Sequence, residues 1–128
     1  MERQDLEQRT LFFARRCVRL ALILPQSILG IHICKQLIRS STSVASNYRA
    51  TCLAQSKKEF IAKISIALEE TDESNFWIEF IDYEKLVKSE KLAELIKESR
   101  ELVKIFAASR ITARKNLKNN NSITKNKQ

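Results

Sequence analysis

Few residues in this chain have the chemistry of metal ligands or nucleophiles. His32 is the single histidine, and the three cysteines are Cys17, Cys34 and Cys52. A zinc site or a nucleophile–base pair needs partners at defined spacings, which these four residues lack. We therefore predict no metal and no cofactor. We expect His32 to be a partly exposed structural residue and the cysteines to pack as small apolar residues in a reducing compartment.

Carboxylates are the next candidates for metal binding or catalysis, and five of them lie close together in one segment. Its acidic residues are Glu69, Glu70, Asp72, Glu73 and Glu79. A di-iron bundle would need Glu-x-x-His on two helices, and no histidine follows any of these residues. Glu70 either pairs with Arg39 at the seam between two helices or is solvated. One glycine cannot build a phosphate-binding loop, so we predict that the protein is not an enzyme.

Basic residues offer a different function, the binding of phosphate groups. The formal net charge is +8: residues 1–55 hold 8 basic and 3 acidic side chains, residues 56–90 hold 5 and 9, and residues 91–128 hold 10 and 3. The candidates for nucleic-acid contact are Arg15, Arg16, Arg19, Arg39, Arg49, Lys57, Lys58 and Lys63. Neutralised phosphates would release counterions and favour binding without base readout. The alternative is a solvated surface that keeps the protein soluble.

Helices must position all of these residues, because the chain has only one Gly and one Pro. Apolar periodicity predicts helices over about 2–24, 28–53, 57–83 and 89–117. Helices of similar length with short connections indicate an all-α fold, an up-down-up-down antiparallel four-helix bundle. We predict that residues 1–117 form this domain. The Asn- and Lys-rich residues 118–128 are typical of a basic, disordered tail.

Local signals support these boundaries. Pro25 ends the first helix and Ser27 can cap the second, while Ser56 and Glu59 form a capping box before the third. The first helix should bury one stripe, which consists of Leu6, Thr10, Phe13, Cys17, Leu20 and Leu24. The second helix has small residues that would let a neighbour approach closely, namely Ser40, Ser41, Thr42, Ser43, Ala45 and Ser46.

An aromatic face on the third helix is a candidate contact for another subunit or a protein partner. It consists of Phe76, Trp77, Phe80 and Tyr83. The apolar run from Leu11 to Leu24 is interrupted by three arginines and is too short to cross a bilayer. With no signal peptide visible, we expect a cytoplasmic protein that does not bind membranes.

The central segment also resembles a known family. The match is carried by Gln36, Leu37, Arg39, Ser40, Ser43, Val44, Asn47, Tyr48, Arg49, Ala50, Ser56, Lys57, Phe60, Ile61, Ile66, Glu70 and Trp77. This pattern is similar to the bacterial four helix bundle protein family, also known as the intervening-sequence-encoded protein of 23S rRNA genes or S23 family. The resemblance implies a ring-shaped homopentamer with basic surface near its axis and an association with nucleic acid. Accessory proteins of diversity-generating retroelements share this fold and bind a reverse transcriptase and RNA.

Two functional hypotheses follow. The first is a non-enzymatic, oligomeric accessory protein that binds RNA or DNA through basic surface. The alternative is a protein–protein interaction scaffold, such as a reverse-transcriptase accessory subunit of a diversity-generating retroelement, that uses the aromatic face.

Overall fold

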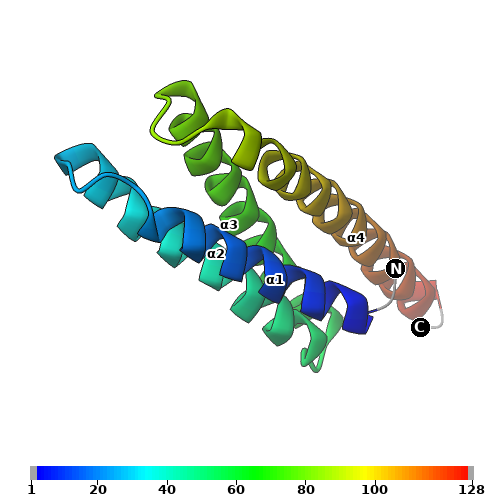
Figure 1. Cartoon of the computed structure of the whole chain (residues 1–128). Coiled ribbons are helices and arrows are strands. Elements are labelled where there is room, and N and C mark those ends of the chain that lie inside the picture. Colours follow the sequence, from blue (N-terminus) through cyan, green and yellow to red (C-terminus); the bar gives the residue numbers. More distant parts are fainter. Residues whose placement is uncertain (1–2, 127–128) are drawn as a thin grey trace.

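Four long helices make up the protein, for which a computed structural model describes the backbone of residues 3–126 and the side chains of 5–88 and 90–120. They are α1 (Arg3–Leu22), α2 (Ile28–Cys52), α3 (Lys57–Tyr83) and α4 (Ala93–Asn126), with a short 3₁₀ helix, η1 (Ser89–Lys91), before α4. Successive helices run in opposite directions (Figure 1). The predicted all-α, up-down four-helix bundle is therefore confirmed.

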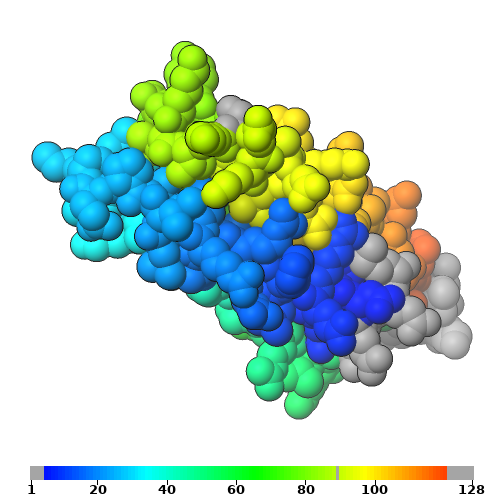
Figure 2. Space-filling view, in the orientation of Figure 1, coloured from blue at the N-terminus to red at the C-terminus, as the bar shows by residue number. Residues whose placement is uncertain are grey.

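Each helix packs extensively on the next one in the sequence, whereas α1 and α4 approach each other at few positions. Side chains bridge this wider seam, where α1 meets the start of α4 (Figure 2). Arg9 Nε donates to Glu98 Oε2 at 2.7 Å, and Arg9 Nη2 donates to Glu101 Oε2 at 2.6 Å. Charged residues of two helices thus close a side of the bundle that has little backbone contact.

The turn between α1 and α2 is built around Ser27 and Gly30. The hydroxyl of Ser27 accepts a hydrogen bond from the backbone N–H of Gly30 at 3.0 Å, which confirms the predicted cap. A Cβ atom on Gly30 would lie 1.9 Å from the carbonyl oxygen of Pro25. Glycine is therefore required here by close backbone approach, a constraint that the sequence alone did not reveal.

Between α2 and α3 the predicted capping box forms with one change. Ser56 Oγ accepts from the N–H of Glu59 at 3.0 Å. The Glu59 carboxylate accepts from the N–H of Gln55 at 3.2 Å, one residue before the cap. Because these groups satisfy each other, α3 begins at Lys57, as predicted.

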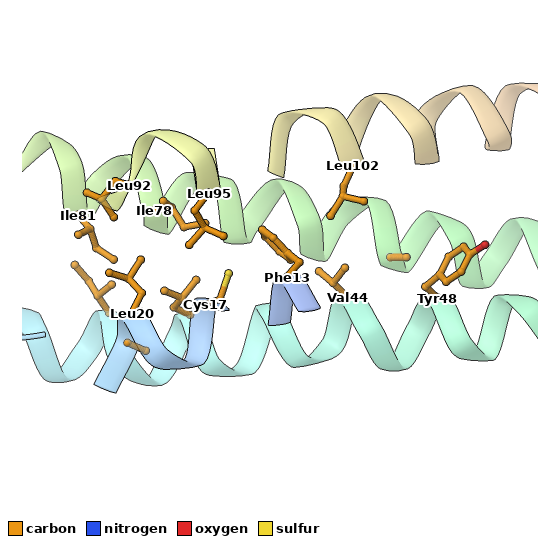
Figure 3. Close-up of a cluster of buried hydrophobic side chains, with 14 of the residues drawn as sticks. Phe13, Cys17, Leu20, Val44, Tyr48, Ile78, Ile81, Leu92, Leu95 and Leu102 are labelled. Carbon is orange, nitrogen blue, oxygen red and sulfur yellow. The ribbon is translucent and has the colours of Figure 1, made fainter. Parts of the chain in front are cut away.

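The core follows the predicted stripe of α1. All six residues of that stripe are buried. Figure 3 shows how Phe13, Cys17 and Leu20 meet Val44 and Tyr48 of α2, Ile78 and Ile81 of α3, and Leu92, Leu95 and Leu102 beside and on α4. In α2 the core includes Ile33 but not Ile31. Ile33 is fully buried and Ile31 is exposed, because the helix is rotated so that its hydroxyl residues also face the core.

Small hydroxyl residues let α2 and α3 pack closely at the centre of the bundle. Ser40 and Ser74 are fully buried, and Ser74 Oγ donates to Ser40 Oγ at 2.9 Å. Between α3 and α4, Asn75 Nδ2 donates to Ser99 Oγ at 2.7 Å. These bonds satisfy polar groups that would be costly to bury without a partner.

The last helix differs from the prediction at both ends. Residues 89–91 form η1, so α4 begins at Ala93 rather than at Ser89. It continues to Asn126, past the predicted end near Leu117, and residues 127–128 of the proposed tail lie outside the described part. No Gly or Pro follows Leu117, so nothing in the sequence blocks the backbone bonds of a longer helix. None of the described helices is both long and apolar enough to span a membrane.

Candidate nucleic-acid and partner surfaces

Arg39 lies at the surface between α2 and α3, where it is already paired. Its Nη1 donates to Glu70 Oε2 at 3.0 Å, and its Nη2 pairs with Glu73. The bond to Glu73, with a further contribution from Glu70, raises the pKa of Arg39. The predicted pairing with Glu70 is confirmed. A phosphate group would have to displace two carboxylates to bind Arg39. Arg39 is therefore a poorer candidate for nucleic-acid contact than an unpaired arginine.

The three arginines of α1 that were predicted to contact nucleic acid, Arg15, Arg16 and Arg19, have different environments. Arg15 and Arg19 are exposed and have no ion pair within the described residues. Arg16 is half-buried, with its guanidinium carbon 5.8 Å from the centre of the Phe12 ring and its Nη2 3.7 Å from Glu94 Oε2. Only Arg15 and Arg19 therefore present unpaired charge to a partner.

One end of the bundle gathers further unpaired cations, and we call it the basic end. It comprises exposed residues at the start of α3 and in the C-terminal part of α4, namely Lys57, Lys58, Arg114, Lys115 and Lys118. None of the five has an ion pair within the described residues. A surface pocket of about 610 Å³ joins the two segments, with Ser56, Lys57 and Phe60 on one side and Ser109 and Asn116 on the other. Lys63 is half-buried farther along α3.

The N-terminus of α3 does not itself offer an open anion site. Its N–H groups and partial positive charge would attract phosphate. Here the Glu59 carboxylate accepts from Gln55, and Ser56 Oγ accepts from the N–H of Glu59. These bonds occupy part of the helix terminus and place a carboxylate beside it, so we expect most phosphate contacts at this end to come from side chains.

The proposed aromatic face divides into two exposed and two half-buried residues. Phe76 is 53% exposed and Tyr83 is 84% exposed. Trp77 and Phe80 pack against the core. Trp77 Nε1 donates to Glu73 Oε2 at 3.2 Å. The Trp77 ring also packs edge-on against the exposed His32 ring, with the two ring centres 5.5 Å apart. Phe76 and Tyr83 are thus the members available to a partner.

A groove between α1 and α2 was not predicted as a site. It has a volume of about 620 Å³ and is lined by Leu11 and Ala14 of α1 and by Thr42, Ala45 and Arg49 of α2. One large apolar side chain in its lining, Leu11, is 55% exposed. The signal in the sequence is that Leu11 is apolar but lies outside the predicted buried stripe of α1.

The histidine and cysteines form no metal-binding cluster in the described part of the chain. Cys17 is buried, whereas Cys34 and Cys52 are half-buried, and none is in a disulfide. Burial raises the pKa of the Cys17 thiol, partly opposed by the charge of Arg16 and a hydrogen bond with Ser41. That thiol is therefore kept protonated and poorly nucleophilic.

Comparisons with known proteins place this geometry in a family. Residues 2–108 match the family described as "23S rRNA-intervening sequence protein". A solved protein of unknown function from the S23 ribosomal protein family of Bacteroides thetaiotaomicron VPI-5482 has a similar fold. The TM-score is 0.77 at 30% identity, over 86% of this chain and 98% of the other. No curated protein matches the chain.

Proposed function

The chain belongs to the 23S rRNA-intervening sequence protein family, and we propose that it is a non-enzymatic, oligomeric accessory protein that binds RNA or DNA through its basic end. The observation that carries this proposal is the set of unpaired cations that α3 and α4 bring together there. Arg39, by contrast, is already neutralised by Glu70 and Glu73.

The physical basis is phosphate neutralisation. Each lysine or arginine that contacts a phosphate releases condensed counterions, and binding weakens as salt rises, with a slope of about −0.7 per phosphate on single strands. The basic end has no arrangement for reading base edges, so the binding should depend little on sequence. An oligomer, which the family resemblance suggests is a homopentamer, would add such weak contacts through avidity.

The test measures RNA binding at a series of salt concentrations. The readout is the fluorescence anisotropy of a labelled single-stranded RNA. We expect Lys57→Ala/Lys58→Ala to weaken binding and reduce the salt slope by about 1.4, or two phosphate contacts. Lysines are unfavourable at a helix N-terminus, so this change should not destabilise the fold.

The matched control is Lys88→Ala/Lys91→Ala, which removes the same charge from the opposite end, where both residues are exposed. We expect this variant to keep the wild-type slope. An equal loss in both variants would mean that only net charge matters, and unchanged binding in Lys57→Ala/Lys58→Ala would refute the proposed site.

The second candidate function is a protein-interaction scaffold, for which the exposed rings of Phe76 and Tyr83 are the specific observation. A reverse transcriptase is the partner class that the family resemblance suggests. Under this hypothesis Phe76→Ser would abolish partner capture and leave RNA binding by each chain unchanged.

A further inference from the structure

The pocket at the basic end lies between two segments that are far apart in the chain. Ser56, Lys57 and Phe60, at the start of α3, form one side, and residues from Ser109 to Asn116 of α4 form the other. Its volume of about 610 Å³ falls within the range of about 300–1,000 Å³ that is typical of small-molecule sites. No carboxylate is among the described residues that line it. The pocket is therefore large enough for a planar ring and does not repel an anion.

Phe60 supplies an aromatic ring to this pocket. The residue is half-buried and packs against the hydrophobic core. Its backbone N–H donates to the carbonyl oxygen of Ser56 at 2.9 Å, in the first turn of α3. The core and the helix thus hold the ring in place while part of it borders the pocket. Unpaired bases of single-stranded nucleic acids stack on aromatic rings that are placed beside basic residues in this way.

Polar side chains surround the ring and are free to bind a ligand. Gln55 and Asn116 are exposed and Ser109 is half-buried, and all three line the pocket. Their side chains make no hydrogen bond within the described residues. Amide and hydroxyl groups can each donate and accept, so they can bind the edge of any base without selecting one. This property agrees with the weak sequence dependence expected of the basic end.

Unpaired cations lie on both sides of the pocket. Lys57 and Lys58 begin α3, and Arg114 and Lys115 directly follow Ala113, which lines the pocket from α4. A strand that crosses the pocket would meet cations both before and after the base that enters it. The phosphates on either side of that base could therefore be neutralised at the same time.

We propose that this pocket receives one unstacked base of a single-stranded nucleic acid, which stacks on Phe60 while the neighbouring phosphates contact the surrounding cations. The inference rests on the proposed function of the basic end and specifies its ligand as single-stranded. In a duplex every base is paired and stacked, so a base reaches Phe60 only if it leaves the helix. Stacking accepts each of the bases, because every base has a π-face.

The test compares a labelled single-stranded RNA with the same RNA annealed to its complement, by fluorescence anisotropy at one low salt concentration. Charge alone would favour the duplex, because its phosphates are more densely spaced. We expect the wild type to bind the single strand more tightly. Phe60→Leu keeps an apolar side chain against the core, and it should weaken binding of the single strand about fivefold or more while leaving duplex binding unchanged.

A second variant tests the pocket without altering Phe60. Ala113→Leu places a larger side chain in the pocket and changes no charge, so it should cause the same selective loss of single-strand binding. The matched control is Phe12→Leu, the same substitution at a ring on α1 that is 56% exposed and lies outside the pocket. It should leave binding of both RNAs unchanged. Circular dichroism verifies that each variant is folded.

The outcomes separate this inference from the proposed function. Unchanged single-strand binding in either folded pocket variant, or an equal loss for both forms of RNA, would overturn the inference alone. The basic end would then bind nucleic acid through charge only. Failure of the wild type to bind either RNA would refute the proposed function, and with it the basis of this inference. The salt slope of Lys57→Ala/Lys58→Ala tests the phosphate contacts separately.

Discussion

At the scale of single residues, the same amino acid has different roles according to what surrounds it. Arg39 is held by two carboxylates, whereas Arg15 and Arg19 are exposed and form no ion pair with any described residue. All three were equivalent candidates for phosphate contact in the sequence. A basic residue is therefore informative about ligands only after its internal partners are known.

Replacing Gly30 with alanine should destabilise the protein, although alanine has the higher helix propensity. In an open helical site, Gly→Ala stabilises a protein by up to about 1 kcal/mol. At Gly30 the new Cβ would meet the backbone carbonyl of Pro25, which cannot move aside without shifting the turn. We expect Gly30→Ala to lower the free energy of unfolding by about 1–3 kcal/mol, measured by urea denaturation. A stabilised variant would show that this close approach is absent in solution.

Cys17 leads to a prediction about reactivity and pH. Its thiol pKa is raised by burial, so the folded protein holds the proton at pH values where the unfolded chain ionises. Stability should therefore fall as the pH rises above about 8.5, the ordinary thiol pKa. In a thiol-labelling experiment under native conditions, the half-buried Cys34 and Cys52 should react before Cys17. Equally fast labelling of Cys17 would mean that α1 opens readily.

At the scale of the helices, the four contacts around the bundle are unequal. Buried apolar and hydroxyl side chains join α1 to α2, α2 to α3 and α3 to α4, but α1 and α4 have few close backbone positions. Across this seam Arg9 makes paired bonds to Glu98 and a further bond to Glu101. The bond to Glu98 also raises the pKa of Arg9.

Replacing Arg9 should therefore matter more than replacing a typical surface arginine. We expect Arg9→Met to lower the free energy of unfolding by about 1–2 kcal/mol, since bonds to charged groups are stronger than neutral ones and this pair is largely shielded from solvent. Hydrogen exchange should increase in α1 and the start of α4. The matched control is Arg39→Met, at a pair with 49% side-chain exposure, where the loss should stay below about 1 kcal/mol. Equal losses would contradict a special role for the α1–α4 seam.

At the scale of the whole molecule, the position of the basic end bears on how a nucleic acid would bind to the proposed oligomer. The basic end lies at one end of the helices, where α2 meets α3 (Figure 1). In an assembly whose symmetry axis runs along the helices, the basic ends of all copies lie on one rim. A nucleic acid on that rim would meet repeated weak sites, and its affinity would depend on assembly.

The sequence alone determined the fold class, most helix boundaries and the buried stripe of α1. These features depend on local rules: the near absence of Gly and Pro, the capping residues Ser27 and Ser56, and an apolar repeat of 3–4 residues. Such signals act within a few turns of one helix, so a linear pattern can reveal them. The capping box was predictable for this reason, whereas the Arg39–Glu70 pair joins two helices and the sequence left it as one of two alternatives.

Only the tertiary structure decided which residues are available to a partner. The rotation of α2 exposes Ile31 and buries Ile33, and the packing of α3 covers Trp77 and leaves Phe76 exposed. The groove between α1 and α2 and the basic end combine residues far apart in the chain. These features depend on how one helix is rotated and placed against another, which hydrophobic periodicity does not specify.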